Sequence, residues 1–363
     1  MKHSDEYWMQ QCLELAKRGA GSVSPNPLVG CVIVQNGKKI AEGYHKQFGG
    51  PHAEVNAINA ALSKNKKLTG ATLYVNLEPC SHHGKTPPCA DAILRHGFAR
   101  VVIGMKDPNP RVSGNGIRKL RGKGVKCTVG VLKKEAGCLN EHFFKFITTG
   151  IPFVALKAAQ TSDGFIAKED GSSRWITNNR SRTYVHRLRA MHDAVLVGAT
   201  TVMQDDPLLT VRHVDGTDPV RVIIDGRFTV TADKKIFSSS PKTIVYVAKG
   251  EALRKKEKLV QLQKKGVEII RLNGKNGHLR IKDIVNDLGR RNIASILVEG
   301  GQTTFASFLS EKVADKMFLF TSRKKFGQGI KTFPEKSVSY KKRLHSVKQF
   351  GTDILQEFEI IFP

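Results

Sequence analysis

Hydrophobic positions in the first 150 residues change between a helical and a strand period. A helix is predicted over residues 5–18, where apolar side chains recur every three or four positions. Apolar strands over 29–35 and 39–44 flank Asn36-Gly37, a dipeptide typical of a hairpin turn. Helices and strands then alternate, which predicts a three-layered α/β/α domain. The remaining predicted elements are helix 52–63, strand 72–77, helix 88–96, strand 100–104, helix 115–121 and strand 126–131.

The rest of the chain also alternates strands and helices, which predicts a mostly parallel sheet. No Gly-x-Gly-x-x-Gly motif is present, but Ile296–Gly301 ends a strand on two glycines before a helix. Backbone amides at that helix start could hold a pyrophosphate. The predicted strands begin with Phe153–Leu156 and continue at 194–198, 220–225, 243–248, 267–272, 295–299 and 316–321. The predicted helices lie near 179–191, 280–289 and 302–310.

Length and cysteine distribution predict two domains, residues 1–149 and 150–363. A chain of 363 residues exceeds the usual size of one hydrophobic core. All six cysteines lie in the first 138 residues, and Thr148–Pro152 supplies turn residues between the halves. A disulfide framework is not expected in a chain of this size.

The formal net charge of +27 is spread over both halves. Such a field attracts nucleic acid, but it also concentrates phosphorylated small molecules and NADPH. The sequence offers no aromatic platform of the kind that single-strand binders use. Met1–Trp8 lacks an apolar stretch for export, and runs such as Leu28–Val34 are too short to span a bilayer. We therefore expect a cytoplasmic protein with no membrane partner.

The most specific chemistry is a histidine followed by two cysteines. His52-Ala53-Glu54 precedes Pro79-Cys80 and Pro88-Cys89. One imidazole and two thiolates hold Zn²⁺ with an open fourth position, and Glu54 remains free to carry a proton. Because His52 and Cys89 both stand at predicted helix starts, two helix N-termini should converge on the metal. The order of these residues is that of the zinc deaminases. The alternatives are a surface His-Glu pair and cysteines that serve only as small buried side chains.

Eight residues separate the two cysteines, which is longer than the commonest deaminase spacing. This segment contains His82, His83 and Lys85, so it is predicted to bind an anion such as a substrate phosphate. The alternative is an ordinary solvated turn, because Gly-Lys-Thr-Pro is also typical of turns.

Several motifs together resemble the bifunctional riboflavin-biosynthesis deaminase/reductase family. The likeness extends over nearly the whole chain and fades after about residue 320. The first half carries it in Asn26–Cys31, Glu78–Cys89 and Lys106–Pro110. The second half carries it in Asp163-Gly164, Ser173–Thr177, Asp205–Arg212 and Val298–Gly301.

The resemblance implies an α/β chain with an N-terminal cytidine-deaminase-like domain and a C-terminal dihydrofolate-reductase-like domain. The implied reactions are zinc-dependent deamination of a diaminopyrimidinone ribosylamino phosphate and NADPH-dependent reduction of its ribosyl chain. One Zn²⁺ per chain and NADPH are the implied cofactors. The phosphorylated pyrimidine is the expected partner, nucleic acid is not, and a homo-oligomer is possible. The competing interpretations are a nucleic-acid base deaminase with an accessory domain and a zinc-stabilised binding module.

The resemblance also implies residue roles. Glu54 is the implied catalytic residue, and His52, Cys80 and Cys89 are the implied metal ligands. Either Lys157 or Glu299 could be the general acid of the reduction. The alternative for Arg189 and Arg212 is a surface ion pair, and for Trp175 it is core packing. The implied cofactor-binding residues are Ala159, Trp175, Thr201, Asp205 and Gly301. The implied substrate-binding residues are Asn26, His82, Lys85, Lys157, Ser173, Arg189, Leu209, Arg212 and Glu299.

Overall fold

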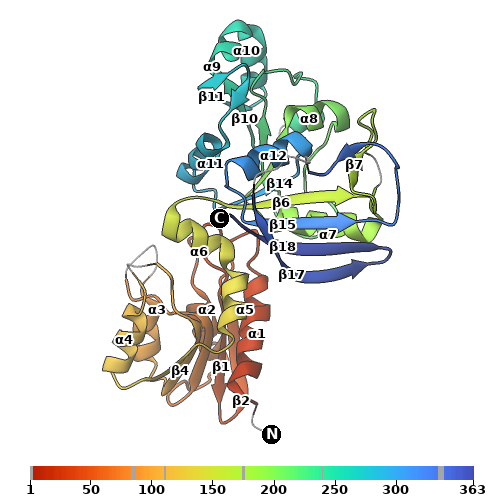
Figure 1. Cartoon of the computed structure of the whole chain (residues 1–363). Helices are drawn as coiled ribbons and strands as arrows, with labels where there is room; N and C mark the ends of the chain where they lie inside the picture. Colours follow the sequence, from red (N-terminus) through yellow and green to blue (C-terminus); the bar gives the residue numbers. More distant parts are fainter. Residues whose placement is uncertain (1–2, 83–86, 110–111, 174–175, 239, 334–338) are drawn as a thin grey trace. The chain divides into compact units, whose positions relative to one another are not determined.

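The computed structural model describes residues 3–82, 87–109, 112–173, 176–238, 240–333 and 339–363. The chain divides into two compact units, Met1–Gly150 and Ile151–Pro363 (Figure 1). Each unit has its own sheet and its own hydrophobic core. No helix in these described ranges has both the length and the apolarity needed to cross a bilayer.

A five-stranded sheet forms the middle layer of the first unit. Its strands are β1 (Gly30–Gln35), β2 (Lys38–Tyr44), β3 (Thr72–Leu77), β4 (Arg100–Met105) and β5 (Lys126–Val129). They lie in the order β2-β1-β3-β4-β5, with β1 antiparallel to β2 and β3, and with β3, β4 and β5 parallel. Asn36 and Gly37 have φ values of 52° and 74°, as the predicted hairpin turn requires.

Helices cover both faces of this sheet. They are α1 (Asp5–Lys17), α2 (Ala53–Leu62), α3 (Cys89–Arg95), α4 (Asn115–Gly122), α5 (Lys133–Leu139) and α6 (Glu141–Thr149). Side chains alternate across β1, so that Cys31 and Ile33 join the core with α2, α3 and α4, whereas Val32 and Val34 pack with α1. Figure 1 shows α1 and α5 on the side of the sheet opposite α3 and α4. The predicted α/β/α layering is confirmed.

A nine-stranded sheet organises the second unit. Its strands are β6 (Phe153–Gln160), β8 (Ala194–Gly198), β9 (Val220–Ile224), β10 (Thr243–Ala248), β11 (Glu268–Leu272), β14 (Ser295–Val298), β15 (Lys316–Thr321), β17 (Lys341–Phe350) and β18 (Asp353–Ile361). They lie in the order β11-β10-β9-β8-β14-β6-β15-β18-β17. All pairs from β11 to β15 are parallel, and only β18 and β17 add antiparallel pairs. The prediction of a mostly parallel sheet is confirmed.

Smaller strands and helices complete this unit. The small strands are β7 (Phe165–Ala167), β12 (Gly274–Lys275), β13 (His278–Leu279) and β16 (Ile330–Lys331). The helices are α7 (Asn179–Met191), α8 (Ala199–Asp205), the 3-10 helix η1 (Lys235–Phe237), α9 (Lys249–Arg254), α10 (Lys256–Lys264), α11 (Ile281–Arg290) and α12 (Gln302–Ser310). Helices α11 and α12 share a core with Leu156 and Leu196, whereas α8 and α10 pack with Val195 and Val197. The sheet therefore carries helices on both faces.

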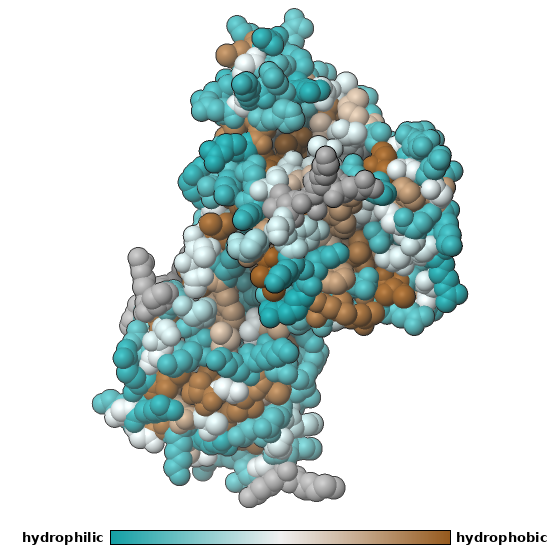
Figure 2. Space-filling view, viewed as in Figure 1, coloured by the Kyte–Doolittle hydropathy of each residue, from teal (hydrophilic) through white to brown (hydrophobic). Residues whose placement is uncertain are grey.

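The structure differs from the predicted elements mainly by containing further helices and strands. Helix α3 begins at Cys89 with Pro88 as its N-cap, one residue later than predicted, and β6 extends from the predicted Leu156 to Gln160. Elements α5, α6, α8, α9, α10, β17 and β18 were not predicted, and neither were the small elements β7, β12, β13, β16 and η1. Strand β17 is the exposed edge of the sheet and lacks apolar alternation. Helices α9 and α10 are rich in charged residues, and their visible surface is mostly hydrophilic (Figure 2).

Candidate functional site

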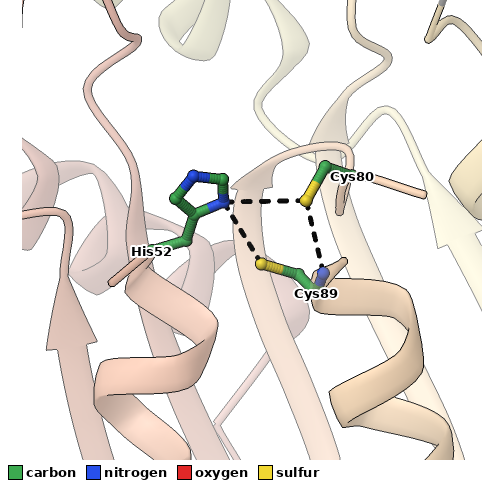
Figure 3. Close-up of side chains that lie close together, drawn as sticks. All are labelled: His52, Cys80 and Cys89. Carbon is green, nitrogen blue, oxygen red and sulfur yellow. Dashed lines mark hydrogen bonds between the residues drawn. The ribbon is translucent and has the colours of Figure 1, made fainter. Parts of the chain in front are cut away.

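Three metal-binding side chains meet at two helix starts in the first unit (Figure 3). His52 is the N-cap of α2, Cys89 is the first residue of α3, and Cys80 lies shortly after β3. His52 Nδ1 lies 3.3 Å from Cys89 Sγ and 3.6 Å from Cys80 Sγ. The three ligand atoms all lie within 4.8 Å of one another. The structure therefore brings all three predicted ligands into one cluster.

The donor set of this cluster fits Zn²⁺. One imidazole nitrogen and two sulfurs fill three tetrahedral positions and leave the fourth open, as in catalytic zinc sites. Hydrogen bonds from the Cys89 thiol and the His52 ring to the sulfur of Cys80 lower the pKa of Cys80 to about 4, although burial opposes them. The backbone amide of Cys89 donates to the same sulfur at 3.2 Å. Cys80 thus favours the thiolate, which is the metal-binding form of cysteine, whereas the same hydrogen bond and burial raise the pKa of Cys89.

Glu54 lies beside the cluster without belonging to it. It stands in the first turn of α2, two residues beyond His52, and only 3% of it is exposed. Its carboxyl group hydrogen-bonds with the Cys89 thiol, and burial raises the pKa of Glu54 to about 6. A carboxyl group with a pKa near neutrality can both accept and donate a proton, which general acid–base catalysis requires.

A histidine that the sequence analysis missed connects Asn26 to the His-Cys-Cys cluster. The side-chain amide of Asn26 donates to His45 Nε2 at 3.1 Å, and His45 Nδ1 donates to the carbonyl of Pro51 at 3.0 Å. Because the amide can only donate through its nitrogen and the carbonyl can only accept, His45 is neutral with its proton on Nδ1. The rings of His45 and His52 meet edge to face at 5.3 Å. Its position one residue after the predicted strand 39–44 was the available signal.

The segment before Cys80 is fixed by a buried carboxylate. Glu78 is 4% exposed and accepts hydrogen bonds from the backbone amides of Asp107, Gly114 and Ile117. These contacts satisfy amides at the start of α4. A Cβ on Gly116 would lie 2.0 Å from the carbonyl oxygen of Pro79, so only glycine allows α4 to approach this closely. Helix α4 therefore holds the chain directly before Cys80, a predicted metal ligand.

The predicted anion-binding segment is only partly described. His82 is exposed and lies two residues after Cys80. His83 and Lys85 lie outside the described residues, so their predicted roles rest on the sequence.

The second unit contains a cavity of about 970 Å³ at the carboxyl ends of its parallel strands. Ligands of α/β sheets bind at this edge. Every predicted cofactor- or substrate-binding residue of this unit that the structure describes lines the cavity; Trp175 lies outside the described residues. The lining includes Lys157, Ala159, Ser173, Arg189, Thr201, Asp205, Leu209, Arg212, Glu299 and Gly301.

Arg189, Glu299 and Lys157 form a buried charged group in the cavity wall. Arg189 Nε donates to Glu299 Oε1 at 2.6 Å, and Arg189 Nη2 donates to Oε2 at 3.0 Å. Lys157 Nζ lies 3.7 Å from the same carboxylate. Burial alone would raise the pKa of Glu299, but the charges of Arg189 and Lys157 lower it to about 2. Burial lowers the pKa of Lys157. Arg189 is therefore in an ion pair, as the alternative held, but a buried one.

Two further contacts order polar groups around the cavity. Ser173 Oγ donates to Asp205 at 3.3 Å. The backbone amide of Arg212 donates to His186 Nδ1 at 3.2 Å, which leaves the proton of this ring on Nε2. Burial, followed by the charge of Arg189, lowers the pKa of His186 to about 4. The sequence analysis missed His186, although it lies three residues before Arg189 and therefore on the same helix face.

The start of α12 offers the backbone amides that a pyrophosphate needs. Gly301 is the N-cap of this nine-residue helix and lines the cavity together with Gly300. A Cβ on Gly301 would meet no atom within 4 Å, so the space in front of the helix is open. Anions bind favourably at such helix starts. This end of the cavity fits the diphosphate of a dinucleotide.

Comparison with known proteins identifies both units. Residues 2–105 match the cytidine and deoxycytidylate deaminase zinc-binding region, and residues 152–356 match the RibD C-terminal domain. The second match continues past residue 320, so the expectation that the likeness fades there is wrong. The riboflavin biosynthesis protein RibD of Aquifex aeolicus (strain VF5) is 42% identical over 367 residues, 99% of each chain. That of Escherichia coli (strain K12) is 38% identical over 346 residues, 91% of each chain.

Solved structures of proteins from the same family are also similar to this chain. A Thermotoga maritima diaminohydroxyphosphoribosylaminopyrimidine deaminase/5-amino-6-(5-phosphoribosylamino)uracil reductase matches with a TM-score of 0.87 and 43% identity over 98% of each chain. Form 1 of Acinetobacter baumannii RibD matches with a TM-score of 0.86 and 36% identity over 99% of each chain. The predicted fold class, a deaminase-like α/β unit followed by a reductase-type α/β unit, is confirmed. The chain therefore belongs to the RibD family of deaminase/reductases of riboflavin biosynthesis.

Proposed function

We propose that the first unit deaminates 2,5-diamino-6-ribosylamino-4(3H)-pyrimidinone 5′-phosphate and that the second unit reduces the ribosyl chain of the product. The observation that carries this proposal is the pairing of two separate sites in one chain. A His-Cys-Cys cluster lies beside the buried carboxyl group of Glu54 in the first unit. A cavity lined by Gly301, the N-cap of α12, lies in the second unit. The name of the Thermotoga maritima relative contains the same two activities.

In the deamination, His52, Cys80 and Cys89 would hold the zinc ion. When bound, zinc supplies the Lewis acidity that makes water a nucleophile at neutral pH. Glu54 accepts a proton from the attacking water and passes it to the departing amino group, so that oxygen replaces nitrogen at C2 of the pyrimidinone and ammonia leaves. A pKa of about 6 suits Glu54 to both transfers.

Substrate binding in the first unit is assigned to Asn26, His82 and Lys85. His45 holds the amide of Asn26 through the bond at 3.1 Å, which restricts the direction in which that amide faces. His82 is exposed and can donate to an anion. Lys85 carries the positive charge that we assign to the phosphate of the substrate.

In the reduction, residues that line the cavity of the second unit orient the sugar and supply a proton. NADPH, when bound, supplies the hydride for C1′ of the ribose. We assign the proton for the ring oxygen released at C1′ to Lys157. Glu299 is unsuited to this role because a carboxyl group with a pKa of about 2 is ionised at neutral pH. Arg212 is exposed at the cavity and is assigned to the substrate phosphate, while Glu299 and Arg189 fix the position of Lys157.

The cytoplasm is the proposed compartment. No disulfide joins the six cysteines, which all lie within the described residues, and this suits a reducing environment.

The test is to incubate the full chain, loaded with zinc, with the diaminopyrimidinone phosphate and NADPH. Ammonia release and NADPH oxidation are followed together. We expect ammonia release without NADPH and NADPH oxidation only after deamination has begun. Ammonia release from short single-stranded DNA or RNA, at a higher rate than from the pyrimidine phosphate, would contradict the proposal.

A further inference from the structure

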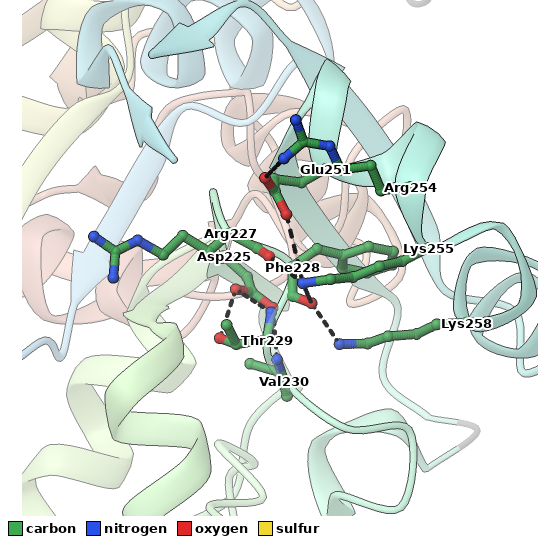
Figure 4. Close-up of polar contacts among 9 residues, drawn as sticks. All are labelled: Asp225, Arg227, Phe228, Thr229, Val230, Glu251, Arg254, Lys255 and Lys258. Carbon is green, nitrogen blue, oxygen red and sulfur yellow. Dashed lines mark hydrogen bonds and ion pairs between the residues drawn. The ribbon is translucent and has the colours of Figure 1, made fainter. Parts of the chain in front are cut away.

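Arg227 presents an unpaired cation to the cavity of the second unit. It follows β9 directly after Asp225 and Gly226, is exposed, and lines the cavity. Within the described ranges its guanidinium makes no hydrogen bond or ion pair, and Figure 4 shows it extending away from Lys255 and Lys258. Arg189, by contrast, lines the cavity in an ion pair with Glu299. Arg227 is therefore available to an anionic ligand.

The turn that carries Arg227 is held rigidly. Both carboxylate oxygens of Asp225 are occupied, because Oδ1 accepts from the amide and hydroxyl of Thr229 and Oδ2 accepts from the amide of Val230, at 2.8 to 3.0 Å. Phe228 has a φ of 53° and is 1% exposed. The ammonium group of Lys258 donates to the Phe228 carbonyl at 2.8 Å and lies 4.5 Å from the centre of its ring. The Arg227 backbone is thus fixed before any ligand binds.

Two glycines make room for this arrangement. A Cβ on Gly226 would lie 1.8 Å from the carbonyl oxygen of Gly277, and a Cβ on Gly277 would lie 2.3 Å from Cγ of Arg227. The hairpin formed by β12 and β13 therefore packs directly against the Arg227 turn. Asn276 and His278 from this hairpin also line the cavity, so the wall here is polar and contains no free carboxylate among the described residues.

The chemistry of this end of the cavity distinguishes two cofactors. In Rossmann folds a carboxylate hydrogen-bonds the ribose 2′-hydroxyl of NADH, whereas an arginine accommodates the 2′-phosphate of NADPH, and the same chemistry applies to a ribose bound at this edge of the sheet. Asp225, which directly follows β9, is the carboxylate that could contact a ribose here. It is only 1% exposed, however, and both of its oxygens already accept hydrogen bonds. Arg227 is presented in its place.

The position of Arg227 along the sheet agrees with the length of the cofactor. Gly301 follows β14, and β9 lies two strands away in the order β9-β8-β14, a separation of roughly 10 Å. A diphosphate at Gly301 would therefore place an adenosine ribose toward β9 and the nicotinamide toward Lys157 on β6, the strand on the other side of β14.

We propose that Arg227 binds the 2′-phosphate of NADPH and makes the second unit selective for NADPH over NADH. The proposal rests on the proposed reductase function. Arg227 acts here as a specificity-determining residue, separate from the group formed by Lys157, Arg189 and Glu299.

The experiment measures equilibrium dissociation constants of NADPH and NADH for the full chain and for Arg227→Gln. We expect the variant to bind NADPH at least about tenfold more weakly, the loss typical of one charge-assisted hydrogen bond, and to bind NADH within about twofold of the wild type. Binding of 2′,5′-ADP should fall with that of NADPH, whereas binding of 5′-ADP should not. Arg271→Gln, which removes an exposed arginine of β11 that does not line the cavity, is the matched control and should change neither constant.

Equal weakening of NADPH and NADH in Arg227→Gln would overturn the proposal, because Arg227 would then contact a part common to both cofactors. Unchanged binding of NADPH would overturn it as well. If the wild-type chain bound neither cofactor, the proposed reductase function itself would fail, and this outcome is distinct from the other two.

Discussion

Arg189 and Glu299, 110 residues apart in the sequence, form a two-point ion pair with donor–acceptor distances of 2.6 and 3.0 Å. The side chains are 12% and 9% exposed, and Lys157 shares the carboxylate. The pair joins α7 to the end of β14. It places both charged groups in the wall of the cavity of the second unit. Its burial makes each partner dependent on the other.

Replacing one partner of this pair should destabilise the second unit. Arg189→Met leaves Glu299 buried with only Lys157 nearby, and we expect a loss of about 3 kcal/mol in the free energy of unfolding. The double variant Arg189→Met/Glu299→Leu should recover part of this loss, because no buried carboxylate remains. Urea unfolding followed in the second unit provides the measurement. A double variant as unstable as the sum of two single losses would contradict this account.

The same carboxylate should affect stability at low pH. The pKa of Glu299 is lowered from 4.5 to about 2 in the folded chain, so its ionised form stabilises the fold. This contribution is complete above about pH 4.5 and is lost as the pH falls toward 2. The difference in unfolding free energy between wild type and Glu299→Gln should therefore shrink across this window. A difference that stays constant from pH 6 to pH 2 would show that the pKa is not lowered.

Glu54→Gln should separate metal binding from catalysis. The amide has the same shape but cannot carry the proton, so we expect about one zinc per chain and a fall in ammonia release of roughly 10² to 10⁴-fold. Metal analysis and an ammonia assay on the same preparation provide the two readouts. Cys89→Ser is the control that should lose zinc as well. Ammonia release by Glu54→Gln at the wild-type rate would remove Glu54 from the mechanism.

Glu78→Gln should weaken zinc binding without touching the metal. The substituted amide places a donor against the backbone amides of Asp107, Gly114 and Ile117, so the segment that ends at Cys80 should lose its fixed position. We expect zinc affinity, measured by competition with a chelator, to fall by about 10 to 100-fold. Glu135→Gln changes an exposed glutamate of α5 and should leave zinc affinity unchanged. Equal affinities in wild type and Glu78→Gln would contradict this role.

The parts of the fold and of the site that the sequence predicts correctly are those determined by neighbouring residues. The starts of α2 and α3 were predicted within one residue, and with them the convergence of His52 and Cys89, because apolar periodicity and proline are local signals. The pairing of Arg189 with Glu299 was not predicted, since it depends on which strands become neighbours. The proposed role of Arg227 was not predicted from the sequence either. It depends on the hydrogen bonds that occupy both oxygens of Asp225, which only the folded structure reveals. Strand β17 lacks apolar alternation because it is an exposed edge.

The most direct test of two reactions at two sites compares Cys89→Ser with Arg212→Ala in the full chain. Ammonia release from the diaminopyrimidinone phosphate and NADPH oxidation on the deaminated intermediate are measured separately. We predict that Arg212→Ala slows NADPH oxidation and leaves ammonia release at the wild-type rate, and that Cys89→Ser abolishes ammonia release while NADPH oxidation continues. Loss of ammonia release in a folded Arg212→Ala variant that still binds zinc would contradict the assignment of the two activities to separate units.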